Sequence, residues 1–147
     1  MVNSRRKGIN GELEAAKLWR RWFPDCRRSF GQARDGYEQP DLIGGMEKDF
    51  YVEVKRTKKF RESMICGTGR CLGWWAKMVG DWLEWQKEND PQDESEPVLM
   101  WREDGGAWWV MVMDGLGQEL GVGQKEPTSW SDFAAAMDKI YPVREHL

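Results

Sequence analysis

The sequence predicts a single α/β domain over residues 1–147, with a central mixed sheet flanked by helices. Apolar residues recur at helical spacing in residues 3–23 and again in residues 74–88. The segment 50–56 alternates apolar and polar residues, as a half-buried strand does. The order along the chain is helix, three short strands, helix, two strands, helix, which is typical of a mixed sheet covered by helices.

The first helix is predicted from an apolar stripe. Its members are Ile9, Leu13, Ala16, Trp19 and Phe23. Pro24 ends the pattern, because proline does not continue a helix. Glu12 lies beside the stripe, so its carboxylate is expected at the border between core and solvent.

Three short strands are predicted next, over residues 26–30, 41–43 and 50–56. A loop rich in turn residues separates the first two strands, and the turn at Gly44-Gly45 separates the second from the third. This short turn favours antiparallel pairing of the second and third strands.

The second half of the chain predicts a helix, a hairpin and a final helix. The helix covers residues 74–88, and strands at 98–102 and 107–113 flank a turn with the sequence EDGG. Ser129 or Ser131 is the expected N-cap of the last helix, because serine accepts hydrogen bonds from the first free N–H groups.

The composition excludes several classes of function. No apolar run approaches the ~18 residues of a membrane span, and no signal-peptide pattern follows the basic N-terminus. We therefore expect a cytoplasmic protein of a prokaryote or a phage-infected cell. The sole histidine, His146, argues against Ser-His and Cys-His catalysis, and three cysteines without a Cys-x-x-Cys pattern do not predict a zinc site.

The charge is distributed unevenly. Residues 1–61 hold 15 Lys and Arg against 9 Asp and Glu, whereas residues 62–147 hold 7 against 16. This asymmetry predicts one positively charged face on a protein of net charge −3. A solvated basic surface without a ligand is the alternative interpretation.

Polar residues on the second and third strands predict a metal site. Glu53 and Lys55 share one face of their strand, and Asp41 begins the neighbouring strand. Two carboxylates placed close together repel each other unless a cation lies between them. Oxygen ligands favour Mg²⁺, with Mn²⁺ as a substitute, and the main-chain carbonyl of Val54 and the carboxylate of Glu12 are candidates for further oxygens.

Such a site suits a substrate with an anionic oxygen, and a phosphodiester is the obvious one. A bound divalent ion lowers the pKa of water and stabilises charge on phosphorus, so the expected reaction is in-line phosphodiester hydrolysis. Lys55 is placed to hold or help deprotonate a water, or to neutralise charge on the phosphate. The alternative is an exposed Glu–Lys pair on an ordinary sheet.

The pattern Pro40-Asp41 followed by Glu53-Val54-Lys55 resembles the PD-(D/E)XK motif of the restriction-endonuclease-like nucleases. With RRKGINGELEA from Arg5 to Ala15 and the later CRRSFG, residues 5–61 most resemble the archaeal-type and phage Holliday junction resolvases.

The resemblance implies a restriction-endonuclease-like fold and a set of roles. Asp41 and Glu53 would bind the metal with help from Glu12, Lys55 would be the catalytic lysine, and Ser29 would match a loop serine near the scissile phosphate. It also implies a homodimer that cuts two symmetric strands of a four-way DNA junction and leaves 5′-phosphates.

Basic residues flank these positions and are expected to contact the phosphate backbone. They are Arg5, Arg6, Lys7, Arg27, Arg28, Arg34, Arg56, Lys58, Lys59 and Arg61. Two alternatives to a junction resolvase stay open. One is a nuclease of the same fold that cuts duplex or flapped DNA, and the other is a DNA-binding module without turnover.

Overall fold

The helices and strands follow the predicted order in a computed structural model that describes residues 4–29, 39–57, 70–89, 94–113 and 127–141. The side chains of residues 4, 5 and 70–72 also lie outside the described part. In chain order the elements are α1 (Ser4–Trp19), β1 (Arg27–Arg28), β2 (Leu42–Ile43), the 3₁₀ turn η1 (Met46–Lys48), β3 (Phe50–Thr57), α2 (Arg70–Asn89), β4 (Glu96–Glu103), β5 (Trp108–Val112), β6 (Thr128–Ser129) and α4 (Trp130–Asp138).

The main sheet has the order β3-β4-β5-β6 and is mixed, as predicted. β3 and β4 pair in parallel, with Phe50 opposite Glu96 and Thr57 opposite Glu103. β4 pairs antiparallel with β5 through the predicted hairpin, and β5 pairs antiparallel with β6. Parallel neighbours require a crossover, and α2 lies between β3 and β4 in the chain.

The predicted antiparallel pairing of residues 41–43 with residues 50–56 is wrong. β2 forms an antiparallel two-stranded sheet with β1 instead. The cause lies at Gly44, whose φ of +113° bends the chain toward Asp25, where a Cβ would lie 2.0 Å from the Asp25 carbonyl oxygen. η1 then separates β2 from β3, so the two glycines form a bend packed on the preceding turn rather than a hairpin.

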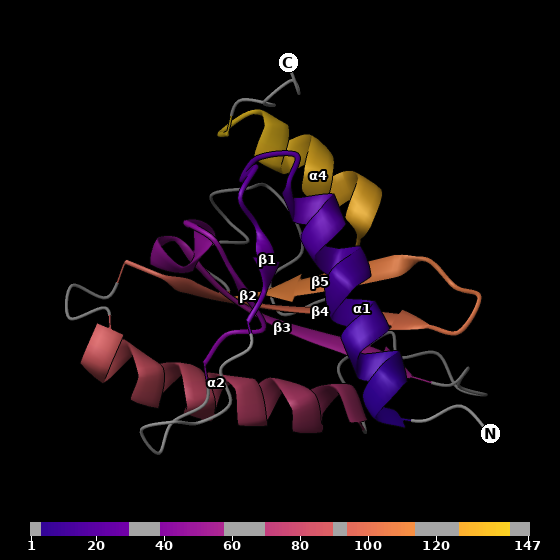
Figure 1. Ribbon diagram of the computed structural model, residues 1–147, viewed down its shortest axis with the longest axis horizontal. Coiled ribbons are helices and arrows are strands. Elements are labelled where there is room, and N and C mark those ends of the chain that lie inside the picture. The colour runs from indigo at the N-terminus through magenta and orange to yellow at the C-terminus, as the bar shows by residue number, and fades with distance from the viewer. Residues whose placement is uncertain (1–3, 30–38, 58–69, 90–93, 114–126, 142–147) are drawn as a thin grey trace.

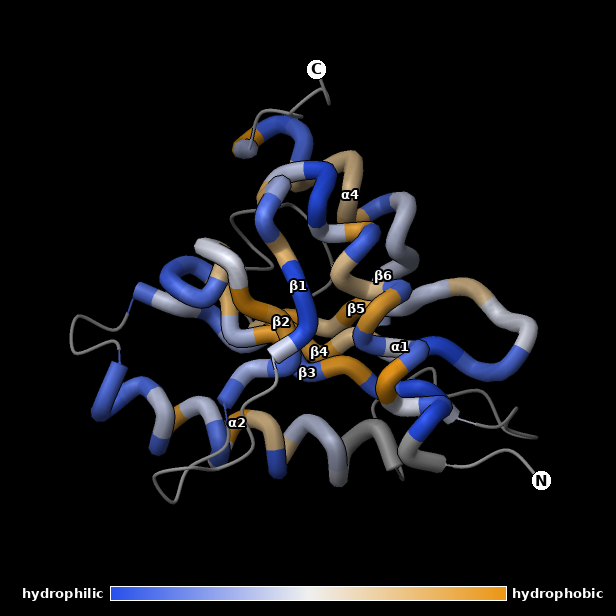
Figure 2. The backbone as a smooth tube through the Cα atoms, viewed as in Figure 1, coloured by the Kyte–Doolittle hydropathy of each residue, from blue (hydrophilic) through white to orange (hydrophobic). Residues whose placement is uncertain are grey.

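Helices cover both faces of the sheet (Figure 1), and each face has its own core. Phe50, Val52 and Val54 face the core under α1 and α4, whereas Tyr51 faces the core under α2. The predicted alternation along β3 is therefore confirmed. Figure 2 shows hydrophobic residues concentrated on the central strands and alternating hydrophobic and hydrophilic residues along α1.

Element ends differ from the predictions by a few residues. α1 ends at Trp19 rather than near residue 23, because the next turn closes with Trp22 and Phe23 both donating backbone N–H groups to the Trp19 carbonyl. α2 begins at Arg70 rather than at residue 74, and the two-residue β6 was not predicted.

The N-cap of α4 is Ser129, one of the two predicted serines. Its hydroxyl accepts a hydrogen bond from the backbone N–H of Asp132 at 3.2 Å. Among the helices that the structure describes, none is both long and apolar enough to cross a membrane.

Candidate active site

Asp41 lies against the edge of β3 that does not pair with β4. Its backbone N–H donates to the Val52 carbonyl at 2.9 Å, and its Oδ2 accepts from the Val54 N–H at 2.8 Å. The N–H and C=O of one strand residue point to the same edge. The Val54 carbonyl therefore points to the edge where the Asp41 carboxylate lies.

Glu53 and Lys55 come together on the β3 face that α2 covers. The Lys55 Nζ lies 3.1 Å from the Glu53 Oε1, and the side chains are 30% and 14% exposed for Lys55 and Glu53. The lysine is thus the more accessible partner of this contact, and its positive charge also acts on Asp41. The predicted shared face of Glu53 and Lys55 is confirmed.

The two carboxylates are held in an unfavourable environment. Burial, followed by the charge of Glu53, raises the pKa of Asp41 well above its ordinary value of 3.8, against a smaller opposing effect of the Val54 N–H. Burial also raises the pKa of Glu53, against the opposing effect of Lys55. Both shifts have the sign expected of carboxylates that share a site without enough positive charge.

Glu12 contributes to this field from α1. Its charge adds to the upward shift in the pKa of Asp41, while its own Oε2 accepts a hydrogen bond from the Arg28 Nε at 2.9 Å. Glu12 is therefore near enough to act on Asp41, but in this structure its carboxylate faces β1.

The donors at the β3 edge suit a hard divalent cation, because they are the carboxylates of Asp41 and Glu53 and the carbonyl of Val54. Negative charge that raises carboxylate pKa values is the charge that such an ion would balance. Within the described ranges, however, no three Asp, Glu, His or Cys side chains are grouped closely enough to hold a metal ion. The participation of Glu12 stays a prediction.

Ser29 lies beside Asp41 through the backbone. The Ser29 N–H donates to the Asp41 carbonyl at 2.8 Å, and the Ser29 hydroxyl donates to Gln39 Oε1 at 3.3 Å. The pairing of β1 with β2 thus brings this serine to the start of the segment that carries Asp41, and its role near a scissile phosphate stays a prediction.

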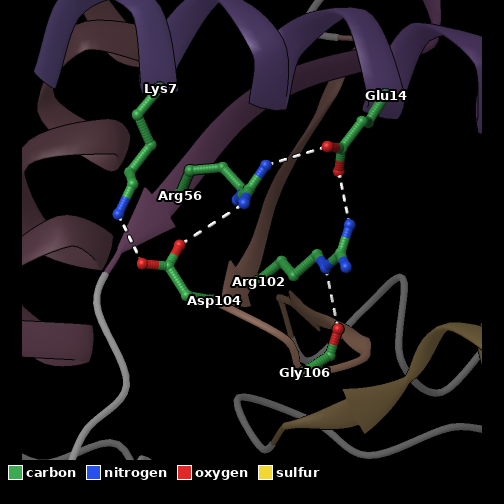
Figure 3. Close-up of polar contacts among 6 residues, drawn as sticks. All are labelled: Lys7, Glu14, Arg56, Arg102, Asp104 and Gly106. Atoms are coloured by element: carbon green, nitrogen blue, oxygen red, sulfur yellow. Dashed lines mark hydrogen bonds and ion pairs between the residues drawn. The ribbon is translucent and has the colours of Figure 1, made fainter. Parts of the chain in front are cut away.

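Two of the predicted DNA-contacting residues belong to an intramolecular ion-pair network (Figure 3). Lys7 contacts Asp104, and Arg56 contacts both Glu14 at 2.8 Å and Asp104 at 3.3 Å. Arg102 completes the network by binding Glu14 at 2.8 Å. These contacts hold α1 to the ends of β3 and β4, and the DNA contacts of Lys7 and Arg56 stay predictions.

The other predicted DNA contacts divide into three groups. Arg6 and Arg27 are exposed, and Arg28 binds Glu12. The remaining ones fall outside the described residues: Arg34, Lys58, Lys59, Arg61 and the side chain of Arg5.

Two residues of α2 that act on the site, Lys77 and Asp81, were not among the predicted site residues. The charge of Lys77 lowers the pKa of Glu53 and the charge of Asp81 raises it, both by less than burial does. The available signal was their spacing of four residues on a predicted helix, but it did not show that this helix face lies over Glu53.

No protein-family model matches the chain, and no curated protein matches it. Among solved structures, the chain is similar to Archaeoglobus fulgidus Hjc, described as a Holliday junction resolvase from an archaeal hyperthermophile. The TM-score is 0.39 at 18% identity, and the match covers 86% of this chain and 91% of that one.

Proposed function

We propose that this chain is a Mg²⁺-dependent endonuclease that resolves four-way DNA junctions by phosphodiester hydrolysis, with Mn²⁺ able to replace Mg²⁺. One observation carries the proposal: Asp41 beside β3 and Glu53 on β3 are largely buried carboxylates with raised pKa values, and Lys55 lies beside Glu53. Structural ion pairs usually lower carboxylate pKa values, whereas raised values in a polar cluster are typical of functional sites.

Each residue has a distinct task in the proposed reaction. Asp41, Glu53 and the Val54 carbonyl would hold the cation, which when bound supplies an activated water and balances charge on the phosphate. Lys55 would orient the water or hold a phosphate oxygen, since its amine is the more exposed partner of Glu53. Glu12 would assist from α1, because its charge already acts on Asp41.

The test is cleavage of a matched set of DNA substrates with and without Mg²⁺. A four-way junction, a Y-shaped fork and a linear duplex of the same arm sequence are incubated with the chain, in Mg²⁺ or in a chelator. We expect cleavage of the junction in Mg²⁺ alone, with ends that a DNA ligase seals because they carry 5′-phosphates. If the linear duplex is cut as fast as the junction, the chain is a less selective nuclease with the same active site and not a junction resolvase.

Asp41→Asn separates a nuclease from a DNA-binding module. The substitution preserves the side-chain shape and an acceptor for the Val54 N–H, so the fold and DNA binding should survive. Cleavage should fall by at least about a hundredfold, the scale on which loss of one catalytic group acts. If the unsubstituted chain binds junctions but never cuts them in Mg²⁺ or Mn²⁺, the binding module is the correct description.

The proposed homodimer is tested separately. Light scattering after size-exclusion chromatography should give twice the 17.2 kDa chain mass, and two symmetric nicks should appear in one junction before the complex dissociates. A monomer that makes a single nick would contradict this part of the proposal.

A further inference from the structure

α2 lies along the face of β3 that carries the site. Tyr51, which shares this face with Glu53 and Lys55, is fully buried and contacts Trp85 of α2 edge to face, with ring centroids 5.5 Å apart. In Figure 1 the helix extends along the whole side of the sheet. Charged side chains of α2 are near enough to this face to act on Glu53, because Lys77 and Asp81 both affect its pKa.

The direction of α2 is fixed by the topology. The helix lies between two parallel strands in the chain, so it runs back along the sheet from the end of β3 to the start of β4. Trp82 agrees with this direction, since its Nε1–H donates at 3.0 Å to the hydroxyl of Ser95, the residue before β4.

Every fourth residue of α2 can therefore follow every second residue of β3 along the sheet. Two strand residues advance about 6.6 Å and four helix residues advance about 6 Å. Starting from the contact of Tyr51 with Trp85, these spacings predict Asp81 near Glu53 and Lys77 one turn further, toward Lys55. The effects of Asp81 and Lys77 on the pKa of Glu53 agree with this placement.

Lys77 and Asp81 form an ion pair on the surface of α2, near Glu53. The Lys77 Nζ lies 2.7 Å from the Asp81 Oδ2, and the lysine is 62% exposed while the aspartate is 20% exposed. The Asp81 carboxylate anchors the Lys77 ammonium on the helix, while most of the lysine side chain is exposed to solvent.

We propose that Lys77 binds a backbone phosphate of the DNA strand next to the scissile phosphodiester, and that Asp81 is its positioning residue. The inference rests on the proposed function and deepens it, since it places the substrate strand between the β3 edge and the first half of α2. A phosphate contact at Lys77, in addition to one at Lys55, would fix the orientation of the DNA backbone relative to Asp41 and Glu53.

The test compares Lys77→Ala with Lys87→Ala, which removes the same charge from an exposed position on the same helix. Both are made in the Asp41→Asn background, so that binding to the four-way junction is measured without cleavage. We expect Lys77→Ala to bind about tenfold more weakly and to reduce the slope of log affinity against log salt by about 1. Lys87→Ala should leave both quantities unchanged.

Two further variants distinguish a phosphate contact from a folding defect. Lys77→Arg should restore most of the affinity, because the positive charge returns. Asp81→Asn removes a negative charge, so its affinity should stay equal or rise, while its single-turnover cleavage rate should fall because Lys77 is no longer held. A rate that stays equal or rises would remove Asp81 from the proposal.

The outcomes for the inference and for the proposed function are distinct. If the unsubstituted chain cuts junctions and Lys77→Ala matches Lys87→Ala in affinity and salt slope, the phosphate contact is wrong and the nuclease stands. If the unsubstituted chain neither binds nor cuts DNA, both are wrong.

Discussion

Asp41 occupies a position that is unfavourable for a carboxylate. Burial and the charge of Glu53 both raise its pKa, and the Val54 N–H offsets only part of this effect. The folded chain therefore binds this proton more tightly than the unfolded chain does. The contribution of Asp41 to stability falls as the pH rises from 3.8 through the raised folded value. A residue that destabilises the fold at neutral pH is better explained by function than by structure.

Asp41→Asn should for this reason stabilise the metal-free protein at neutral pH. Asparagine keeps an acceptor for the Val54 N–H and removes the repulsion by Glu53. We expect the free energy of unfolding to be higher than that of the unsubstituted chain at pH 7 and unchanged near pH 3, where the carboxyl is protonated in both the folded and the unfolded chain. Urea unfolding in a chelator at both pH values measures this.

Asp25→Asn is the control for that measurement, since Asp25 is an exposed carboxylate on the preceding turn. A loss of stability at pH 7 in Asp41→Asn, with Asp25→Asn unchanged, would mean that the Asp41 carboxylate stabilises the fold and that its environment is not strained.

At the scale of elements, the approach of α1 to β3 depends on one glycine. A Cβ on Gly11 would lie 2.5 Å from the Arg56 Cγ, whereas a Cβ on Gly8 would meet no atom within 4 Å. The Arg56 side chain has little freedom to move aside, because Glu14 and Asp104 hold its guanidinium. The same helix thus has one glycine that packing requires and one that it does not.

Alanine at these two positions should have opposite effects. Gly8→Ala should stabilise the protein by about 0.5–1 kcal/mol through helix propensity. Gly11→Ala gains the same propensity but overpacks the contact with Arg56, so it should destabilise by about 1–3 kcal/mol. Equilibrium urea unfolding of both variants is the measurement, and equal effects of the two substitutions would show that α1 does not approach β3 this closely.

The ion-pair network gives Arg56 a structural role that its sequence context did not indicate. Arg56→Met keeps much of the apolar stem and removes two ion pairs, so it should lower the free energy of unfolding by about 1–3 kcal/mol. Arg6→Ala, at an exposed position of α1, should change it by less than about 0.5 kcal/mol. Thermal unfolding at low and moderate salt compares them, and a difference confined to DNA affinity would instead make Arg56 a phosphate contact.

At the scale of the whole molecule, the sequence predicted what depends on local periodicity. The two long helices, the alternation along β3 and the Ser129 cap each depend on residues close together in the chain, and the structure confirms them. The apolar stripe predicted for the first helix holds at the buried Ala16 and Trp19, but Leu13 is 48% exposed and Phe23 lies beyond the end of α1. Partners distant in sequence were not predictable from local pattern. Lys7 meets Asp104 across 97 positions, and β3 pairs with β4 across a whole helix.

Some features of the candidate site were likewise predictable from local pattern, and others depend on the tertiary fold. Glu53 and Lys55 share a face by strand period alone, so their contact was predictable. The predicted nearness of Asp41 to Glu53 agrees with their charge interaction, although it was argued from a strand pairing that the structure does not have. The role proposed for Lys77 depends on the direction of α2, which only the parallel pairing of β3 with β4 determines.

The core beneath α1 offers a probe of how the whole molecule opens. Cys26 is buried, with its Sγ 3.2 Å from the Met46 Sδ, and burial is the main cause that raises the pKa of its thiol to about 12. At pH 8 a thiol of this pKa is ionised in roughly one molecule in ten thousand, and the thiolate is the reactive form. Cys26 should therefore resist alkylation for as long as the fold is intact.

Iodoacetamide labelling at pH 8 across a urea series, read by peptide mass spectrometry, tests this expectation. The Cys26 core also contains residues of α4 and of the four strands β2 to β5, so α1 should not separate from the sheet alone. We expect modification of Cys26 to follow the same urea midpoint as tryptophan fluorescence. Labelling at lower urea, with the fluorescence unchanged, would show that the layer under α1 opens independently of the layer under α2.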